Sequence, residues 1–216
     1  MIISTKKPIE ELMGMLEGVK KVALVGCAAC AAACNVGGEK ECKEMQEYLE
    51  STGREVVGYV VPEESCQKLL VKKEIKAFRD ADFEVIVSLA CGNGAQTVAE
   101  NVDIPVYPAN NTIFVGQTER VGIFTEMCRL CGDCVLGDTG AICPISKCPK
   151  SLVNGPCGGQ KNGKCEASPD NDCAWILIYE RLSKLGQLDK LGKTNRVKGF
   201  SAQSWPRAVN AKEEKK

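Results

Sequence analysis

The sequence predicts an α/β fold, a small doubly wound parallel sheet followed by a C-terminal cysteine-rich, cluster-bearing module. Two observations indicate this class. Short apolar runs alternate with helical segments over residues 9–107, which is typical of a parallel sheet with helices on its faces. Eight of the fourteen cysteines then fall within residues 128–173, a stretch with too few apolar residues to bury a core of its own.

The elements of the N-terminal part follow from hydrophobic periodicity. An amphipathic helix is expected within residues 1–18, where Ile9, Leu12, Met15 and Leu16 have helical spacing. Strands are expected at 21–26, 55–61, 84–90 and 104–107, with helices at 30–50 (broken near Gly37-Gly38), 67–79 and 93–101. Residues 108–127 are expected to lead out of this domain.

Three parts are expected along the chain. They are an α/β domain at 1–118 with a metal cluster at the carboxyl edge of its strands, a ferredoxin-like cysteine-rich module at 119–209, and a disordered tail at 210–216. A helix at 174–185, capped by Asp172, closes the module. Its Trp175, Ile178 and Leu182 share one apolar face, which we expect to pack on the module.

Composition and charge narrow the function classes. Lysine plus arginine and aspartate plus glutamate both number 28, so no net charge attracts nucleic acid or an anionic membrane. No apolar run is long enough to span a bilayer, and the first residues do not resemble a secretory signal, so we expect a cytoplasmic protein. In a reducing cytosol, fourteen cysteines indicate metal or redox chemistry.

The absence of histidine restricts the kind of metal site. It excludes mixed cysteine–histidine zinc sites, His-ligated haem, Rieske centres and acid–base catalysis by histidine. All-thiolate coordination remains, which suits zinc or iron–sulfur clusters.

Five cysteines are expected to converge at one edge of the sheet. Cys27 and Cys91 directly follow predicted strands, and Cys66 lies shortly beyond another. The carboxyl ends of parallel strands share one edge, where open α/β sheets bind ligands. Cys30 and Cys34 follow Cys27 at helical spacing and share its face. Because a [4Fe–4S] cluster uses four thiolates, we expect Cys27, Cys30, Cys66 and Cys91 to bind one, with Cys34 as a spare or substitute.

Two other interpretations apply to single thiols or pairs of thiols in this part of the chain. Cys42 is expected to be a small buried core residue. Cys27 and Cys30 have the spacing of a thioredoxin-like redox pair, an interpretation that leaves Cys66 and Cys91 without a role.

The second cysteine group opens with C-x2-C-x2-C, formed by Cys128, Cys131 and Cys134, as a bacterial ferredoxin motif does. Two Cys-Pro steps follow, at Cys143 and Cys148, at a spacing that differs from the standard motif. The group is completed by Cys157, Cys165 and Cys173. Eight thiols make two complete sets of four, so we expect up to two [4Fe–4S] clusters. The spacing leaves their partition open.

Structural zinc is the main alternative for this group. Modules with four thiolates around zinc are also small and held together by metal in place of a core. Zinc sites usually contribute ligands in pairs, so the tight triplet favours iron–sulfur. Zinc in place of one cluster stays open.

Several strings in the cysteine-rich segment resemble one known family. They are Gly132-Asp133-Cys134, Gly140-Ala141-Ile142-Cys143-Pro144, Cys148-Pro149, Asn154-Gly155-Pro156-Cys157-Gly158-Gly159, Gly163-Lys164-Cys165-Glu166 and Asp172-Cys173-Ala174-Trp175. Together they resemble the cysteine-rich domain that accompanies methylenetetrahydrofolate reductase in anaerobes, the MetV-type small subunit of the two-subunit enzyme. The likeness extends upstream to Cys27, Cys66 and Cys91 and covers roughly residues 20–205.

The resemblance implies a role in the folate branch of one-carbon metabolism, of the Wood–Ljungdahl type. The partner would be a flavin-bearing TIM-barrel catalytic subunit that binds FMN and reduces methylenetetrahydrofolate. This chain shows no flavin or folate site and no evident general acid, so FMN is expected in the partner only. We therefore expect a non-catalytic subunit that relays electrons between a redox donor protein and that flavin. A zinc-stabilised assembly subunit and a thiol–disulfide protein are the alternatives.

Overall fold

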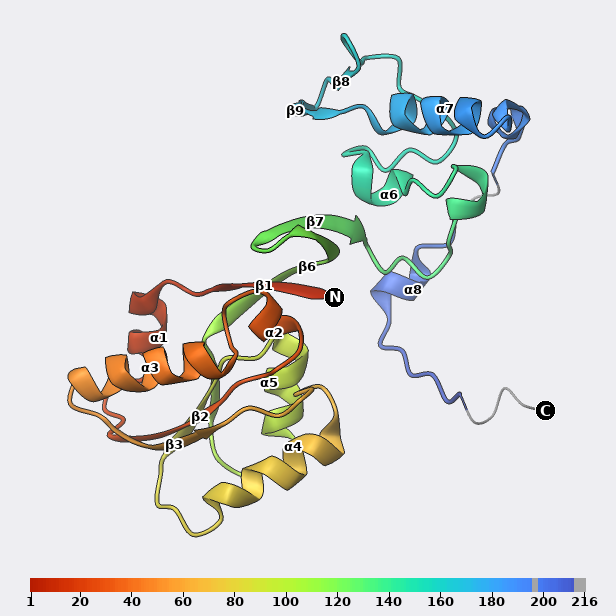
Figure 1. Ribbon diagram of the computed structural model, residues 1–216. Helices are drawn as coiled ribbons and strands as arrows, with labels where there is room; N and C mark the ends of the chain where they lie inside the picture. The colour runs from red at the N-terminus through yellow and green to blue at the C-terminus, as the bar shows by residue number, and fades with distance from the viewer. Residues whose placement is uncertain (196–197, 212–216) are drawn as a thin grey trace. The chain divides into compact units, whose positions relative to one another are not determined.

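The computed structural model of the chain describes residues 1–195 and 198–211. The chain divides into two compact units, Met1–Thr125 and Glu126–Lys216 (Figure 1). Residues 212–216 of the tail predicted to be disordered lie outside the described residues. None of the described helices is long and apolar enough to cross a membrane.

A parallel sheet of four strands lies at the centre of the N-terminal unit. Its strands are β2 (Lys21–Val25), β3 (Glu55–Val60), β4 (Val85–Ser88) and β5 (Val106–Pro108), in the order β3-β2-β4-β5. All three pairings are parallel, so the predicted parallel sheet is confirmed. The chain leaves β2 in one direction along the sheet and returns to place β4 on its other side. The carboxyl ends of β2 and β4 therefore flank the topological switch point, where such sheets bind ligands.

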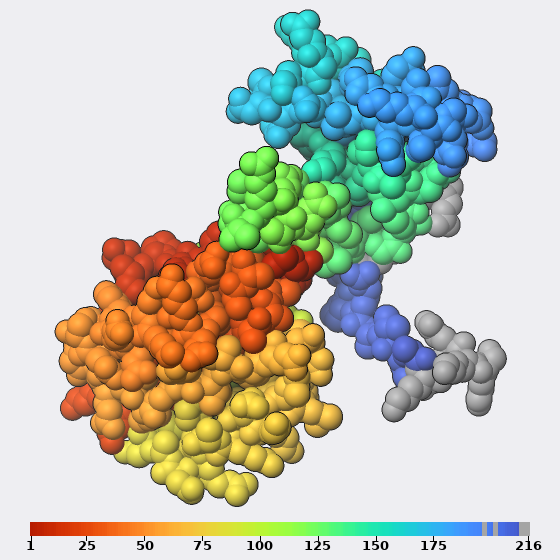
Figure 2. Space-filling model, in the orientation of Figure 1, coloured from red at the N-terminus to blue at the C-terminus, as the bar shows by residue number. Residues whose placement is uncertain are grey.

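Helices cover both faces of this sheet (Figure 1). They are α1 (Ile9–Met15), α3 (Glu39–Ser51), α4 (Lys68–Glu74) with a 3-10 turn at Ile75–Phe78, and α5 (Gly92–Ala99), whereas the short α2 (Cys30–Ala33) packs at the carboxyl edge of the sheet. Leu24 packs with α1 and α3 on one face, whereas the adjacent Ala23 packs with α4 and α5 on the other. This follows from the alternation of side chains along a strand. In Figure 2, α3 in orange and α4 in yellow form broad parts of the unit's surface.

A second, antiparallel sheet was missed by the sequence analysis. Strands β1 (Ile2–Lys6), β6 (Asn110–Arg120) and β7 (Ile123–Cys128) pair in the order β1-β6-β7. The expectation that residues 108–127 only lead out of the domain was therefore wrong. Each strand depends on cross-strand partners, and β1 pairs with residues more than a hundred positions away, so no local pattern indicates it.

The C-terminal unit has few regular elements. They are 3-10 turns at Leu136–Asp138 and Leu188–Gly192, helix α6 (Pro144–Lys147), strands β8 (Lys164–Cys165) and β9 (Ser168–Asp172), helix α7 (Ala174–Lys184) and helix α8 (Ser201–Ser204). The predicted apolar face of α7 is confirmed, because Trp175, Ile178 and Leu182 form a small buried cluster. The predicted cap was wrong. Cys173 occupies the N-cap, because Asp172 ends β9 and pairs with Lys164 at 2.8 Å.

Candidate metal centres

Three thiols from separate strand ends lie at the carboxyl edge of the parallel sheet. Cys27 follows β2, Cys66 follows β3, and Cys91 forms the N-cap of α5 directly after β4. Burial raises the pKa of the Cys66 thiol, and the negative charges of Glu64, Cys27 and Cys91 raise that pKa further. Such mutual influence requires nearby groups. The topology therefore places these three thiols at the same edge of the sheet.

The other two cysteines of this edge lie on α2 and contact strand β1. The backbone N–H of Ile2 donates to the Cys30 sulfur at 3.4 Å, and the Cys34 thiol donates to the Ile2 carbonyl oxygen at 3.8 Å. Burial raises the pKa of Cys34, and the charges of Cys30 and Cys91 add to that rise. All five thiols thus belong to one group, and β1 contacts two of them.

The antiparallel sheet covers this edge. Ile3 of β1, Phe114 of β6 and Phe124 of β7 pack against the cluster of buried residues that contains Cys27 and Cys34. Apolar side chains therefore exclude water from much of the edge, which lowers the local polarity around the sulfurs.

Hydrogen bonds between loops fix the spacing of the thiols. The buried hydroxyl of Ser65 donates to the Gly26 carbonyl oxygen at 2.6 Å, joining the residues that precede Cys66 and Cys27. The buried amide of Asn110 donates to the carbonyl oxygens of Leu89 at 2.5 Å and Val36 at 3.2 Å. The segment before Cys91 is thereby joined to the segment after Cys34. Sequence analysis missed Ser65 and Asn110, because no local motif marks them.

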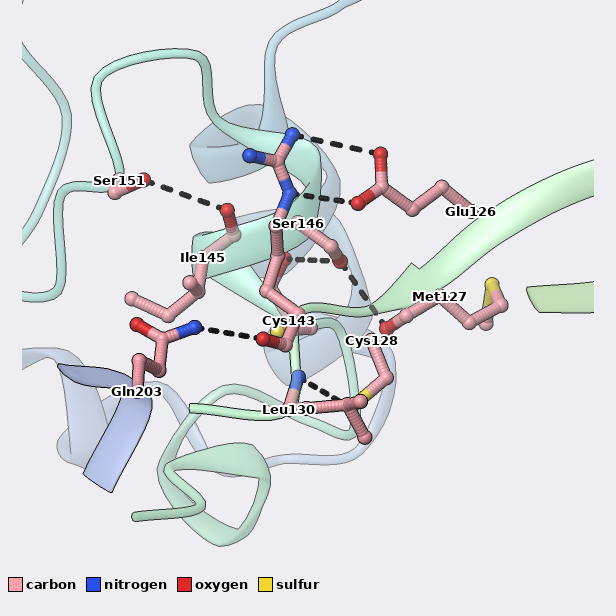
Figure 3. Close-up of polar contacts among 10 residues, drawn as sticks. Glu126, Met127, Cys128, Leu130, Cys143, Ile145, Ser146, Ser151 and Gln203 are labelled. Atoms are coloured by element: carbon pink, nitrogen blue, oxygen red, sulfur yellow. Dashed lines mark hydrogen bonds and ion pairs between the residues drawn. The ribbon is translucent and has the colours of Figure 1, made fainter. Parts of the chain in front are cut away.

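Four cysteines of the C-terminal unit line one cavity of about 460 Å³, and we call them the first quartet. They are Cys128, Cys131, Cys134 and Cys143. The backbone N–H of Leu130 donates to the Cys128 sulfur at 3.4 Å. Ser146 donates to the Met127 carbonyl oxygen at 3.2 Å, which holds the start of this loop against α6 (Figure 3). The triplet motif is therefore completed by the first of the two Cys-Pro cysteines.

The remaining four cysteines line a different cavity of about 20 Å³, and we call them the second quartet. They are Cys148, Cys157, Cys165 and Cys173. Cys143 and Cys148 are the N-cap and C-cap of α6, so this one helical turn separates the quartets. The two cavities thus divide the eight thiols into two sets of four.

Charged side chains accompany the second quartet. Glu166 accepts hydrogen bonds from the Lys150 ammonium and from the Cys157 thiol, the latter at 3.5 Å. Lys150 first and Cys157 second hold the pKa of the Glu166 carboxyl below its usual range. The ion pair lies on the cavity wall, beside one of the four sulfurs. Sequence analysis gave no role to either residue.

Comparison with known proteins found a match for the segment that contains both quartets. Residues 107–201 match the model of the family described as Methylene-tetrahydrofolate reductase C terminal. This segment is similar to that family. The resemblance inferred from the cysteine motifs is confirmed for it, and all eight cysteines of the two quartets fall within the match. No curated protein and no solved structure matched the chain. The likeness drawn for residues 20–106 stays a prediction.

Neither within residues 107–201 nor at the sheet edge do the described sulfur atoms surround a point where a metal could bind. No three cysteine, aspartate or glutamate side chains among residues 1–195 and 198–211 stand closely enough to hold a metal ion as they are.

The donor set nevertheless fits an iron–sulfur cluster at two places. All fourteen cysteines are free thiols. The sheet edge offers more than the four thiols that a cluster needs, and the first quartet surrounds a roomy cavity. Each site also has a backbone N–H directed at a sulfur, from Ile2 and from Leu130. The second quartet fits less well, because its cavity is small.

Cys42 stands apart from these groups. It is fully buried in the core between α3 and the sheet, and burial raises the pKa of its thiol to about 12. The expectation that Cys42 is a core residue is confirmed.

Proposed function

We propose that this chain is an electron-transfer iron–sulfur subunit of a methylenetetrahydrofolate reductase complex. It relays electrons between a redox donor protein and the FMN of a TIM-barrel catalytic subunit, in one-carbon metabolism of the Wood–Ljungdahl type. The observation that carries the proposal is the family match over residues 107–201, which encloses both cysteine quartets.

The thiols supply the ligands in this proposal. Cys27, Cys30, Cys66 and Cys91 would hold one [4Fe–4S] cluster, with Cys34 in reserve, and the first quartet would hold another. A bound cluster supplies one-electron transfer, with a potential set by its charge, its hydrogen bonds and its exposure. The chain contributes the N–H groups of Ile2 and Leu130, which donate to ligand sulfurs and tune that potential.

The two sites differ in their access to solvent. Ile3, Phe114 and Phe124 cover part of the sheet edge, where Cys66 alone of the five cysteines is exposed, whereas Cys128 and Cys134 of the first quartet are both exposed. A cluster at the first quartet would therefore lie near the surface, where the redox group of another protein can approach it.

Anoxic purification of the full chain tests the proposal. We expect brown protein with iron and sulfide in equal amounts, and a broad visible absorption band that dithionite bleaches. Cys27→Ala and Cys131→Ala should each remove part of that band. Cys42→Ala is the control, because Cys42 is a core residue and its loss should leave the band intact. Folded protein without iron would overturn the proposal.

Transfer to the partner is a second test. Chain reduced by dithionite and freed of excess reductant should reduce the FMN of the catalytic subunit in stopped-flow mixing. The Cys131→Ala variant should do so more slowly. Equal rates for the variant and the parent chain would mean that the first quartet carries no electrons.

A zinc-stabilised assembly subunit of the same reductase is the second candidate. The small cavity of the second quartet favours it, since a single ion occupies much less space than a cluster. This candidate predicts colourless, zinc-loaded protein whose removal destabilises the catalytic subunit whatever the electron donor.

A further inference from the structure

The two quartets of the C-terminal unit offer very different amounts of space. The first surrounds about 460 Å³ and the second about 20 Å³. A cavity needs about 10–15 Å³ of this volume to hold one water molecule, so the second has room for about one. A core of four irons and four sulfides is several times larger than a water molecule, whereas a single metal ion is smaller than one. The second cavity therefore has the size for an ion.

The wall of the second cavity is poorly suited to expand. Cys173 and Trp175 line it and pack directly on Ile178 and Leu182, which are fully buried. The indole N–H of Trp175 donates to the Leu152 carbonyl oxygen at 3.1 Å, which fixes the ring. Opening the cavity enough for a cluster would break this bond and disturb the main apolar cluster of the unit, a loss that close-packed interiors resist.

The ligand arrangement also differs between the quartets. The first has three cysteines at three-residue spacing on one loop. The second takes its ligands from four places: the end of α6, the glycine-rich loop, strand β8 and the N-cap of α7. An open hollow along Lys150–Cys157 touches only Cys157 of the four, so it does not enlarge the shared space.

We propose that the second quartet binds one zinc ion through four thiolates, and that iron–sulfur clusters are confined to the first quartet and the sheet edge. The inference about iron rests on the proposed function. On binding, Zn²⁺ forms four bonds to sulfur and releases four protons, so the site changes from four neutral thiols to a centre of net charge −2. The Lys150 ammonium lies beside Cys157 and is paired with the Glu166 carboxylate. The zinc joins the β8–β9 hairpin to α6 and α7.

Metal analysis of the full chain tests this inference. The protein is produced with iron in excess, purified without oxygen, and analysed for zinc and iron by mass spectrometry. We expect about one zinc per chain, and zinc X-ray absorption showing four sulfur ligands at about 2.3 Å. Iron without zinc, or zinc with nitrogen or oxygen ligands, would overturn the inference.

Matched variants locate the metal. Cys165→Ala should remove the zinc and keep the iron, whereas Cys131→Ala should remove about four irons and keep the zinc. Loss of iron and not zinc from Cys165→Ala would show a cluster at the second quartet. If Cys165→Ala does not fold, the zinc content and sulfur coordination of the parent chain still decide.

The outcomes separate this inference from the proposed function. Zinc with four sulfurs but no iron would support the inference on the second quartet and end the electron-transfer proposal. Iron in both quartets would contradict the inference on the second quartet and support the electron-transfer proposal.

Discussion

The hydroxyl of Ser65 donates a hydrogen bond of 2.6 Å to the carbonyl oxygen of Gly26, and Ser65 is fully buried. Each residue directly precedes a cysteine of the sheet edge, Cys66 and Cys27. The loop after β3 is therefore tied to the end of β2 by one bond, which sets the separation of the two thiols.

Replacing Ser65 with alanine should weaken both the fold and the metal site. The Gly26 carbonyl oxygen would lose this partner in a buried place, which costs about 1–3 kcal/mol of unfolding free energy. We expect the variant to bind less iron at the sheet edge, because Cys66 is no longer held near Cys27. Urea unfolding and the iron content of the anoxic protein measure the two effects.

Ser51→Ala is the matched control for that substitution. Its hydroxyl also donates to a carbonyl oxygen at 2.6 Å, that of Tyr48, but Ser51 is exposed and water can replace it. We expect a change within about 0.5 kcal/mol and unaltered iron. Equal losses in both variants would show that the Ser65 bond has no special role.

Gly37 lies where two segments of the edge approach each other most closely. A Cβ added there would stand 1.8 Å from the Leu89 carbonyl oxygen, a backbone atom that cannot move aside by rotation. Gly37→Ala should therefore cost more than about 3 kcal/mol, at the upper end of overpacking effects. Thermal and urea unfolding check this.

Gly14→Ala provides the opposite control. Gly14 is exposed in α1, and an added Cβ meets nothing within 4 Å. The substitution should stabilise the chain by about 0.5–1 kcal/mol, because alanine loses less backbone freedom in a helix. If Gly37→Ala were as harmless, the close approach at Leu89 would have to be wrong.

Glu84 should contribute to the acid sensitivity of the N-terminal unit. It accepts hydrogen bonds from the backbone N–H groups of Lys20 at 2.6 Å and Lys21 at 2.9 Å, and these bonds lower the pKa of its carboxyl. Because the folded-state pKa lies below the unfolded one, the stabilisation is fully present above the unfolded value of about 4.3. It is lost as pH falls through the folded-state pKa.

Glu84→Gln checks this pH dependence. The glutamine amide keeps an oxygen that can accept these hydrogen bonds but does not titrate. As the pH falls below about 4.3, the free energy of unfolding should therefore decrease less steeply than in the parent chain. Urea midpoints from pH 3 to 7 measure the slope. Asp80→Asn is a suitable control, because no hydrogen bond to Asp80 is seen among the described residues. Parallel curves for Glu84→Gln and the parent chain would contradict the assignment.

The parallel sheet was predictable because its signal is local. Each strand is a short apolar run followed by a glycine, proline or cysteine, and the crossover rule then places the carboxyl ends of the strands at one edge. The antiparallel sheet was not predictable, because Ile2 pairs with Val115. A five-residue strand at the start of a chain has no partner that its own sequence reveals.

The candidate sites were likewise predictable only where residues close in sequence define them. Spacing identified the thiols at the strand ends and the triplet at Cys128, because these depend on neighbours in sequence. It did not divide the eight C-terminal thiols. That division depends on α6, a single turn with Cys143 at one end and Cys148 at the other. Asn110 was missed for a similar reason, since its amide joins Val36 to Leu89 only after folding.

If the second quartet binds zinc, as we infer, removal of the zinc should change the fluorescence of Trp175. This indole lines the cavity and is 7% exposed, whereas Trp205 is 71% exposed. In a Trp205→Phe background, chelation should move the emission to longer wavelength, because loss of the metal frees the wall of the cavity and lets water reach the ring. In the converse Trp175→Phe protein, the emission of Trp205 is already that of a hydrated indole and should not move. A shift in neither protein would mean that no metal supports this cavity.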